Sequence, residues 1–195
     1  MPKLWNETIE AHRRTVRDAI LDTTAALVAE RGLLGVTMSQ IAEQTGIGRA
    51  TLYKYFPAVE TIVLVWHDRR VAEHLKELVT ARDHAGGAEQ RLEAVLRTYA
   101  HIQRERGHHG EHESFGADVF AALHKGEYVA RAHQELDELL RDVLAGAAEA
   151  GHVRADVPAD ELAAYCRHAL QAAAAMPSKA AVQRLLEVVM AGMRP

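Results

Sequence analysis

Apolar residues recur three and four positions apart through most of this chain, a spacing that predicts helices burying one face each. In the first stretch, the stripe of Val16, Ile20, Thr23 and Leu27 predicts a helix from residue 6 or 8 to residue 31. The two-residue alternation of a half-buried β-strand is nearly absent. The pattern therefore predicts an all-α fold of about nine helices.

Six further helices are expected after residue 58, and glycine or proline marks most of the gaps between them. A glycine pair lies in the loop at 83–88, Gly151 opens another loop, and Pro177 separates the last two helices. These last two helices are rich in small and aliphatic side chains, which allow helices to pack closely. The expected ranges are 59–82, 89–106, 114–125, 127–150, 159–176 and 178–193.

Residues 36–56, VTMSQIAEQTGIGRATLYKYF, predict two short helices joined by a tight turn. Thr37 and Gln40 have the spacing of a capping box, in which each side chain satisfies a backbone amide at the start of a helix. Gly46 favours the left-handed conformation that ends many helices. A second helix is then expected at 48–55. Two short helices with a glycine in the turn between them form a helix-turn-helix.

The second of these helices has the composition of a helix that enters the major groove of DNA by its N-terminal end. Arg49 can bind a guanine edge or a phosphate, and Thr51 can contact a thymine methyl group or a phosphate. Amides and hydroxyl groups at the start of the preceding helix are further phosphate ligands. The predicted DNA-binding residues are Thr37, Ser39, Gly48, Arg49, Ala50, Thr51, Tyr53, Lys54 and Tyr55.

The run TMSQIAEQTGIGRATLYKYF resembles the DNA-binding signature of the TetR family of bacterial transcriptional regulators. The shared features are a Thr cap, an IAxxxG core and turn, and a recognition helix that ends in L-Y-x-[HY]-F. The resemblance implies a helix-turn-helix DNA-binding domain at 1–56 and a ligand-binding and dimerisation domain at 57–195. It also implies phosphate contacts by Tyr53 and Tyr55, whereas Val59 stands where the family has a phosphate-binding Lys.

The same resemblance implies a homodimer that forms through the last two helices, at about 159–193. Two recognition helices related by two-fold symmetry would read half-sites about 34–36 Å apart, or a multiple of that distance, on a near-palindromic double-stranded DNA operator. A small-molecule effector bound in the body would release the DNA, which describes a ligand-responsive repressor. An activator, or a regulator without an effector, is also compatible with the sequence. No enzymatic activity and no cofactor are expected.

The effector pocket is expected to be mostly apolar, with a few polar anchors. For each candidate residue, an ordinary place in the hydrophobic core is the alternative to a place in the pocket. The sequence does not indicate which small molecule binds. The predicted pocket residues are Trp66, Tyr99, Phe115, Phe120, His133, Leu136 and Tyr165.

A histidine-rich segment, GHHGEHE at 107–113, suggests a second kind of chemistry. On a helix, His108 and His112 would lie on one face and bind Zn²⁺ or Ni²⁺, which would make the protein a metal-responsive regulator. Gly107 and Gly110 favour a solvated loop instead, so no metal ligand is assigned. The H-E-x-x-H order of a metalloprotease is absent. A metal-dependent hydrolase is therefore the weakest of these alternatives.

Charge is distributed unevenly along the chain, whose net charge is −4. Seven basic and six acidic residues precede Pro57, whereas the rest of the chain holds 16 basic and 21 acidic residues. Only the N-terminal part is therefore suited to lie close to phosphates. The segment with Trp5, Arg13 and Arg14 either contacts the DNA backbone or places Trp5 over the domain core, and the second alternative is favoured.

The single cysteine, Cys166, cannot form an internal disulfide and is expected to be a small buried apolar residue. No apolar run reaches the 18 or so residues that a membrane span needs. The N-terminus lacks a hydrophobic signal segment. These features predict a cytoplasmic protein.

Overall fold

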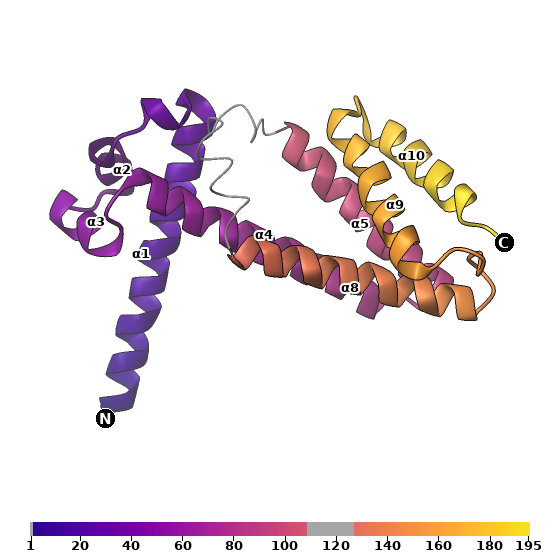
Figure 1. Cartoon of the computed structure of the whole chain (residues 1–195). Helices are drawn as coiled ribbons and strands as arrows, with labels where there is room; N and C mark the ends of the chain where they lie inside the picture. The colour runs from indigo at the N-terminus through magenta and orange to yellow at the C-terminus, as the bar shows by residue number, and fades with distance from the viewer. Residues whose placement is uncertain (1, 109–126) are drawn as a thin grey trace. The chain divides into compact units, whose positions relative to one another are not determined.

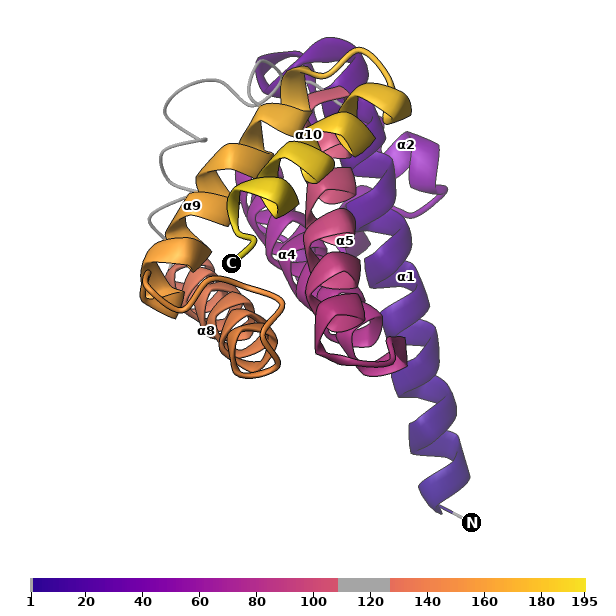
Figure 2. The same cartoon turned by 90° about the vertical axis from the view of Figure 1, so that its right-hand side faces the viewer.

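The computed structural model describes residues 2–108 and 127–195, with side chains at 8–107 and 129–195. Helices make up nearly all of these residues, and no β-strand occurs among them (Figure 1, Figure 2). The all-α prediction is therefore confirmed, while the helix expected at 114–125 lies outside the described residues. The α-helices (α) and 3-10 helices (η) are α1 (Pro2–Arg31), η1 (Leu33–Gly35), α2 (Met38–Thr45), α3 (Arg49–Tyr55), α4 (Val59–His84), α5 (Ala88–His108), α8 (Glu127–Glu149), α9 (Ala159–Gln171), η2 (Ala172–Ala175) and α10 (Lys179–Gly192).

The described chain forms two compact units, and the division between them falls inside α4. Residues 2–70 belong to the first unit, and residues 71–108 and 127–195 belong to the second. The domain boundary predicted at residue 56 precedes α4, and the first turns of α4 are part of the apolar core of the first unit. The buried side chains that join α4 to this core are Val59, Ile62 and Val63.

The helix α1 supplies a long apolar face to the first unit. Ile20 and Val28 are fully buried, and the half-buried Val16 packs at the edge of the same core. Thr24 is also fully buried, and its hydroxyl donates a hydrogen bond of 2.8 Å to the Ile20 carbonyl oxygen, which satisfies the polar group. The sequence pattern placed Thr23 on this face, but Thr23 is only half-buried because Thr24 is the position that points into the core.

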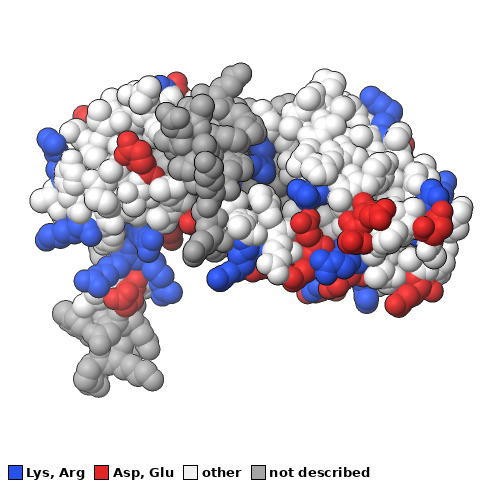
Figure 3. All heavy atoms as spheres, viewed as in Figure 1, with Lys and Arg blue, Asp and Glu red and all other residues white. Residues whose placement is uncertain are grey.

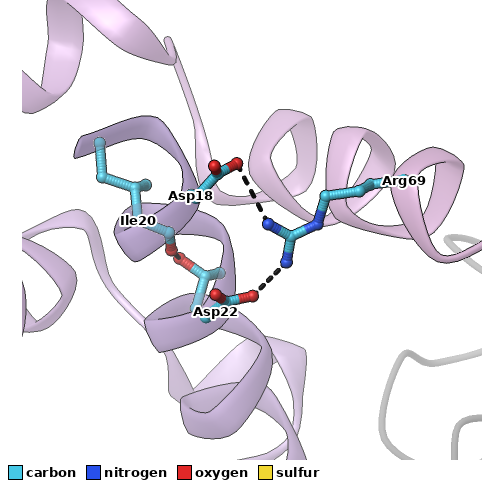
Figure 4. A network of polar contacts seen from close by, with 5 residues as sticks. Asp18, Ile20, Asp22 and Arg69 are labelled. Atoms are coloured by element: carbon cyan, nitrogen blue, oxygen red, sulfur yellow. Dashed lines mark hydrogen bonds and ion pairs between the residues drawn. The ribbon is translucent and has the colours of Figure 1, made fainter. Parts of the chain in front are cut away.

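Two ion pairs join α1 to α4 within the first unit (Figure 4). Nη1 of Arg69 on α4 lies 3.2 Å from Oδ1 of Asp18, and Nη2 of the same guanidinium group binds the Asp22 carboxylate. Asp18 and Asp22 are one turn apart on α1, so both can face a single arginine. The Arg69 side chain is 27% exposed, which makes this contact partly shielded from solvent.

The helix α5 is central to the second unit, where it packs against α8, α9, η2 and α10 (Figure 2). Leucine side chains from four helices fill the core between these elements. The fully buried leucines are Leu92 and Leu96 of α5, Leu140 and Leu144 of α8, Leu170 of α9 and Leu186 of α10.

None of the helices in the described ranges combines the length and the apolar composition needed to cross a bilayer.

The backbones of α5 and η2 approach each other closely at Gly107 and Ala174. A Cβ atom added at Gly107 would lie 2.7 Å from the carbonyl carbon of Ala174, closer than two carbon atoms can pack. The sequence predicts a polar connection at this glycine, but α5 continues through it, and the missing side chain permits the close packing. The single helix expected at 159–176 is also divided, because α9 ends at Gln171 and the next four residues form η2.

Candidate nucleic-acid interface

The helix-turn-helix begins with a capping box at the N-terminus of α2. The Thr37 amide donates a hydrogen bond of 2.8 Å to Oε1 of Gln40, and the Gln40 amide donates one of 3.4 Å to Oγ1 of Thr37. These two bonds satisfy amides that the start of a helix leaves without a backbone partner. Local chemistry therefore fixes where α2 begins, at the position that the sequence predicted.

The turn between α2 and α3 is centred on Gly46, which has φ 69° and ψ 19°. The Ile47 amide donates a hydrogen bond of 3.1 Å to the Ala42 carbonyl, and the Gly46 amide donates one of 3.2 Å to the Glu43 carbonyl. This is the hydrogen-bond pattern of a Schellman motif, whose left-handed residue is favourable mainly for glycine. The turn directs the chain into α3 after Gly48.

The helix α3 is anchored by one buried side chain and exposes most of the others. Leu52 is 0% exposed, and Phe56, directly after the helix, is 2% exposed. Tyr55 is half-buried against the same core. The rest of the helix forms a mainly polar surface with two cations on a rigid support. Its exposed residues are Arg49, Ala50, Thr51, Tyr53 and Lys54.

The other predicted DNA contacts lie at the starts of α2 and α3. Ser39 and Gly48 are exposed, and Gly48 precedes α3 without any side-chain cap. Thr37 is exposed as well, but both its amide and its hydroxyl donate hydrogen bonds to Gln40. A phosphate at Thr37 would therefore have to share or replace those bonds. All the residues predicted to bind DNA lie in the first unit, and their contacts with DNA remain predictions.

The start of α4 offers no cation to DNA at the position that the family resemblance singled out. Val59 is 8% exposed and belongs to the same apolar cluster as Leu52 and Phe56. The side chain thus contributes to the core of the first unit. Phosphate neutralisation has to come from other elements of this unit, because affinity for DNA depends on cations close to its backbone.

Cations of the first unit are found on α1 as well as on α3. Figure 3 shows Lys and Arg side chains gathered on the part of α1 that extends beyond the core of the first unit, with others on the left-hand edge of the same unit. Arg17 of α1 lies over the ring of Phe56, with its guanidinium carbon 5.6 Å from the ring centroid. This cation–π contact places a cation of α1 beside the end of α3.

Tyr99 and Leu136, both predicted for the effector pocket, are buried in the core of the second unit. Burial raises the pKa of the Tyr99 phenol, and the nearby Arg167 opposes that rise. The Arg167 guanidinium group lies 3.1 Å from Oδ1 of Asp137. Tyr99 therefore belongs to the apolar core and lies close to a polar group of α9.

The remaining predicted pocket residues are not brought together within one unit. Trp66 is half-buried against the core of the first unit. In the second unit, His133 is exposed and Tyr165 is 43% exposed. Phe115 and Phe120 lie outside the described residues. The place of the effector pocket stays a prediction.

Two hollows of the second unit have charged as well as small or apolar residues in their walls. One hollow of about 210 Å³ lies among the end of α4, the start of α5 and α8, and another of about 170 Å³ lies between α8 and α9. Neither is lined by a residue predicted for the effector pocket. The charged residues are Arg82, Arg91 and Asp142 in the first hollow, and Asp137, Arg141, Asp160 and Arg167 in the second.

The histidine-rich segment and the cysteine were the other candidates for chemistry. Residues 109–113 and the side chain of His108 lie outside what the structure describes. Within the described ranges, no group of three His, Cys, Asp or Glu side chains is arranged to hold a metal ion. Cys166 is fully buried, and its thiol donates a hydrogen bond of 3.2 Å to Sδ of Met193. Burial raises the pKa of this thiol to about 12, as suits a packing role.

The contacts that tie α1 to the rest of the first unit were not predicted. Asp18 and Arg69 are 51 residues apart in the chain, so no local pattern connects them. One sequence feature could have pointed to the ion pairs: Asp18 and Asp22 are four positions apart and lie on one helix face. This spacing indicates that a cation binds both carboxylates, but it does not identify the residue that carries the cation. The stacking of Arg17 on Phe56 left no signal in the sequence.

The sequence matches two protein families. Residues 20–64, which contain the helix-turn-helix, match the family described as "Bacterial regulatory proteins, tetR family". Residues 99–195 match the family described as "Transcriptional regulator SbtR-like, C-terminal domain". The two matches together extend over well more than half of the chain.

The HTH-type transcriptional regulator BetI of Rhizobium meliloti (strain 1021) is similar to this chain. The two are 27% identical over 121 residues, which cover 62% of this chain and 49% of BetI. The chain spans about half the length of the curated relatives it matches.

Solved structures share the fold along nearly the whole chain. A transcriptional regulator of the TetR/AcrR family from Thermobifida fusca YX-ER1 is 16% identical, with 92% of this chain and 98% of that chain covered at a TM-score of 0.74. AibR, solved in complex with isovaleryl coenzyme A and operator DNA, is also 16% identical, with the same coverage and a TM-score of 0.63. At these identities the likeness establishes the fold.

Proposed function

The chain belongs to the TetR family of transcriptional regulators, and we propose that it is a homodimeric repressor that a small molecule releases from its operator. The family assignment supplies a DNA-binding helix-turn-helix and a ligand-binding C-terminal domain. The dimer, the direction of regulation and the release by an effector are the further steps of the proposal.

The observation that carries the proposal is the geometry of α3. Its buried Leu52 holds the helix on the core, while Arg49, Thr51 and Lys54 are exposed to solvent. A helix held in this way can enter the major groove, where arginine reads guanine and threonine contacts thymine or phosphate. The capping box and the Gly46 turn keep α2 and α3 in a fixed relation, as groove reading requires.

A homodimer through α9 and α10 would present two copies of α3 to a near-palindromic operator. Tyr165 on α9 is 43% exposed and Val188 on α10 is 66% exposed, so both helices carry large apolar side chains on their surface. Exposed alanines accompany them and would allow close approach of a second copy. The large apolar and small side chains together support a four-helix interface made of two α9–α10 pairs.

Release by an effector would act through α4, because this helix contributes residues to both units. An effector that binds more tightly to the DNA-incompetent arrangement would weaken operator binding by the difference in its binding energies, typically about 1–3 kcal/mol. The ion pairs between Arg69 and α1 would carry a displacement of α4 to the helix-turn-helix. Acyl-coenzyme A thioesters are the first compounds to test, because AibR binds one.

Selection of random DNA duplexes by the purified full-length protein, followed by sequencing of the retained fragments, tests the proposal. We expect enrichment of a near-palindrome whose half-sites are spaced by one or more helical turns. The enriched duplex then serves as the probe for a screen of small molecules that release the protein. Retention of duplexes without any common sequence would contradict sequence-specific regulation, and a monomer at all concentrations would contradict the dimer.

A further inference from the structure

The N-terminal half of α1 leaves the core of the first unit and stays uncovered. Every residue from 8 to 15 is exposed, whereas the continuous buried face of the helix starts at Ile20. Most helical stability in proteins comes from the packing of one face against a partner. An exposed helical segment of this length is therefore suited to bind something outside the chain.

The arginines of this segment lie on the side of α1 that faces the helix-turn-helix. Arg13, Arg14 and Arg17 precede the buried Ile20, Leu21 and Thr24 at the spacing of three and four residues that defines one helix face. The contact between Arg17 and the Phe56 ring confirms this direction independently, because Phe56 directly follows α3. The arginine face thus continues the packing face of α1 beyond the edge of the core.

Positive charge dominates this face. Residues 8–17 contain three arginines and one acid, Glu10, which lies 3.2 Å from Nη1 of Arg13. Both side chains of that pair are more than 60% exposed, so the pair is weak and easily exchanged for a phosphate. Asp18, the next acid along the helix, is engaged by Arg69 of α4. Arg14 makes no ion pair with any described side chain.

We propose that Arg13 and Arg14 form a second DNA-contacting surface that binds backbone phosphates beside the half-site read by α3, with Arg17 as the positioning residue between the two surfaces. The inference rests on the proposed function, because it takes the DNA at α3 as given. The buried Val59 supplies no cation at the start of α4, so these arginines add phosphate neutralisation that α4 does not provide. Phosphate contacts fix register and add affinity without reading sequence.

Binding of the full-length protein to two labelled duplexes, the selected operator and a scrambled duplex of equal length, tests this inference across a salt series. Arg13→Gln/Arg14→Gln removes both proposed contacts from each protomer, about four phosphates per dimer. The slope of log affinity against log salt should become shallower by about 3–4 units on both duplexes. Between 50 and 200 mM salt, the wild type should then lose about 100-fold more affinity than the variant. Arg13→Lys/Arg14→Lys keeps the charges and should retain most of the slope.

The control variant Lys76→Gln/Arg131→Gln removes two exposed cations from the second unit and should leave the slope within about one unit of the wild type. All variants should keep the wild-type circular dichroism spectrum and melting temperature, because the substituted side chains are exposed.

A wild-type slope in Arg13→Gln/Arg14→Gln, or an equal loss of slope in the control variant, would overturn the inference. A wild type that shows no preference for any sequence would refute the proposed function instead, and the scrambled duplex would still report on the arginines.

Discussion

Nη1 of Arg69 on α4 lies 3.2 Å from Oδ1 of Asp18 on α1, and the other arm of the same guanidinium group binds Asp22 (Figure 4). Two carboxylates one helical turn apart thus share one arginine from a helix that is distant in sequence. Arginine suits this arrangement because its planar group donates in two directions at once. The contact joins α1 to α4 at Arg69.

Removal of this contact should weaken the first unit measurably. Arg69→Gln is expected to lower the free energy of unfolding by about 0.5–1 kcal/mol, because the ion pairs are partly shielded from solvent. Urea unfolding of wild type, Arg69→Gln, Asp18→Asn and the double variant gives the coupling energy of the pair. The same cycle on Arg97 and Glu93, an exposed pair within α5, should give a smaller value. A zero coupling energy for Arg69 and Asp18 would contradict a stabilising role.

Arg49→Ala should weaken operator binding by about 5- to 150-fold, since an arginine contact to a base or phosphate contributes about 1–3 kcal/mol. Arg49 is exposed on α3, so the substitution should leave folding and dimerisation intact. Fluorescence anisotropy with the selected operator at fixed salt measures the loss. Arg31→Ala, at the far end of α1, is the control and should bind as the wild type does. Equal binding by Arg49→Ala would exclude Arg49 from the interface.

Val188→Glu should convert the proposed dimer to a monomer. Val188 is 66% exposed on α10, and a carboxylate in the centre of an apolar helix interface would lose its hydration without gaining a partner. Light scattering coupled to size-exclusion chromatography measures the mass directly. Val79→Glu, at a surface position of α4 that is 37% exposed, serves as the control and should remain dimeric. An unchanged mass for Val188→Glu would move the interface away from α10.

Two Gly→Ala substitutions should have opposite effects on stability. At Gly107, the new Cβ would overlap the Ala174 backbone, and overpacking of this kind costs about 1–3 kcal/mol. At Gly146, within α8, a new Cβ meets nothing within 4 Å, so the higher helix propensity of alanine should stabilise the protein by about 0.5–1 kcal/mol. Urea unfolding distinguishes the two. A neutral Gly107→Ala would show that α5 and η2 can move apart without cost.

Cys166 should make stability decline at alkaline pH. Burial raises the pKa of its thiol from 9.0 to about 12, so the unfolded chain loses this proton at lower pH than the folded one. Stability from the buried thiol is therefore complete below about pH 9 and falls as the pH rises toward 12. The stability advantage of the wild type over Cys166→Ala should shrink between pH 8 and pH 10.5 in thermal unfolding. A constant difference would indicate that the folded thiol ionises normally.

Sequence reasoning succeeded where structure is determined by neighbours in the chain. The capping box at Thr37, the left-handed Gly46 and the buried Leu52 all follow from the chemistry of a few adjacent residues. For this reason the helix-turn-helix, its exposed residues and the all-α fold could be predicted. Helix ends set by local caps, such as the start of α10 after Ser178, were also within reach.

The features that escaped prediction depend on residues far apart in the chain. Gly107 carries a packing role only because Ala174 lies against it, and the sequence around each gives no sign of the other. Thr23 was expected on the buried face of α1, but the orientation of α1 on its neighbours buries Thr24 instead. Aromatic and histidine content does not distinguish an effector pocket from the hydrophobic core, because Tyr99 fits equally well into an ordinary core.

The division of the chain inside α4 has a practical consequence for anyone who wishes to isolate the DNA-binding part. A fragment cut at Phe56, where the signature motif ends, would remove Ile62 and Val63 and open the core around Leu52 to water. A fragment that extends to Arg70 would keep these side chains and would also retain Arg69, the partner of Asp18. Expression of the shorter piece should therefore yield an aggregation-prone or unfolded chain.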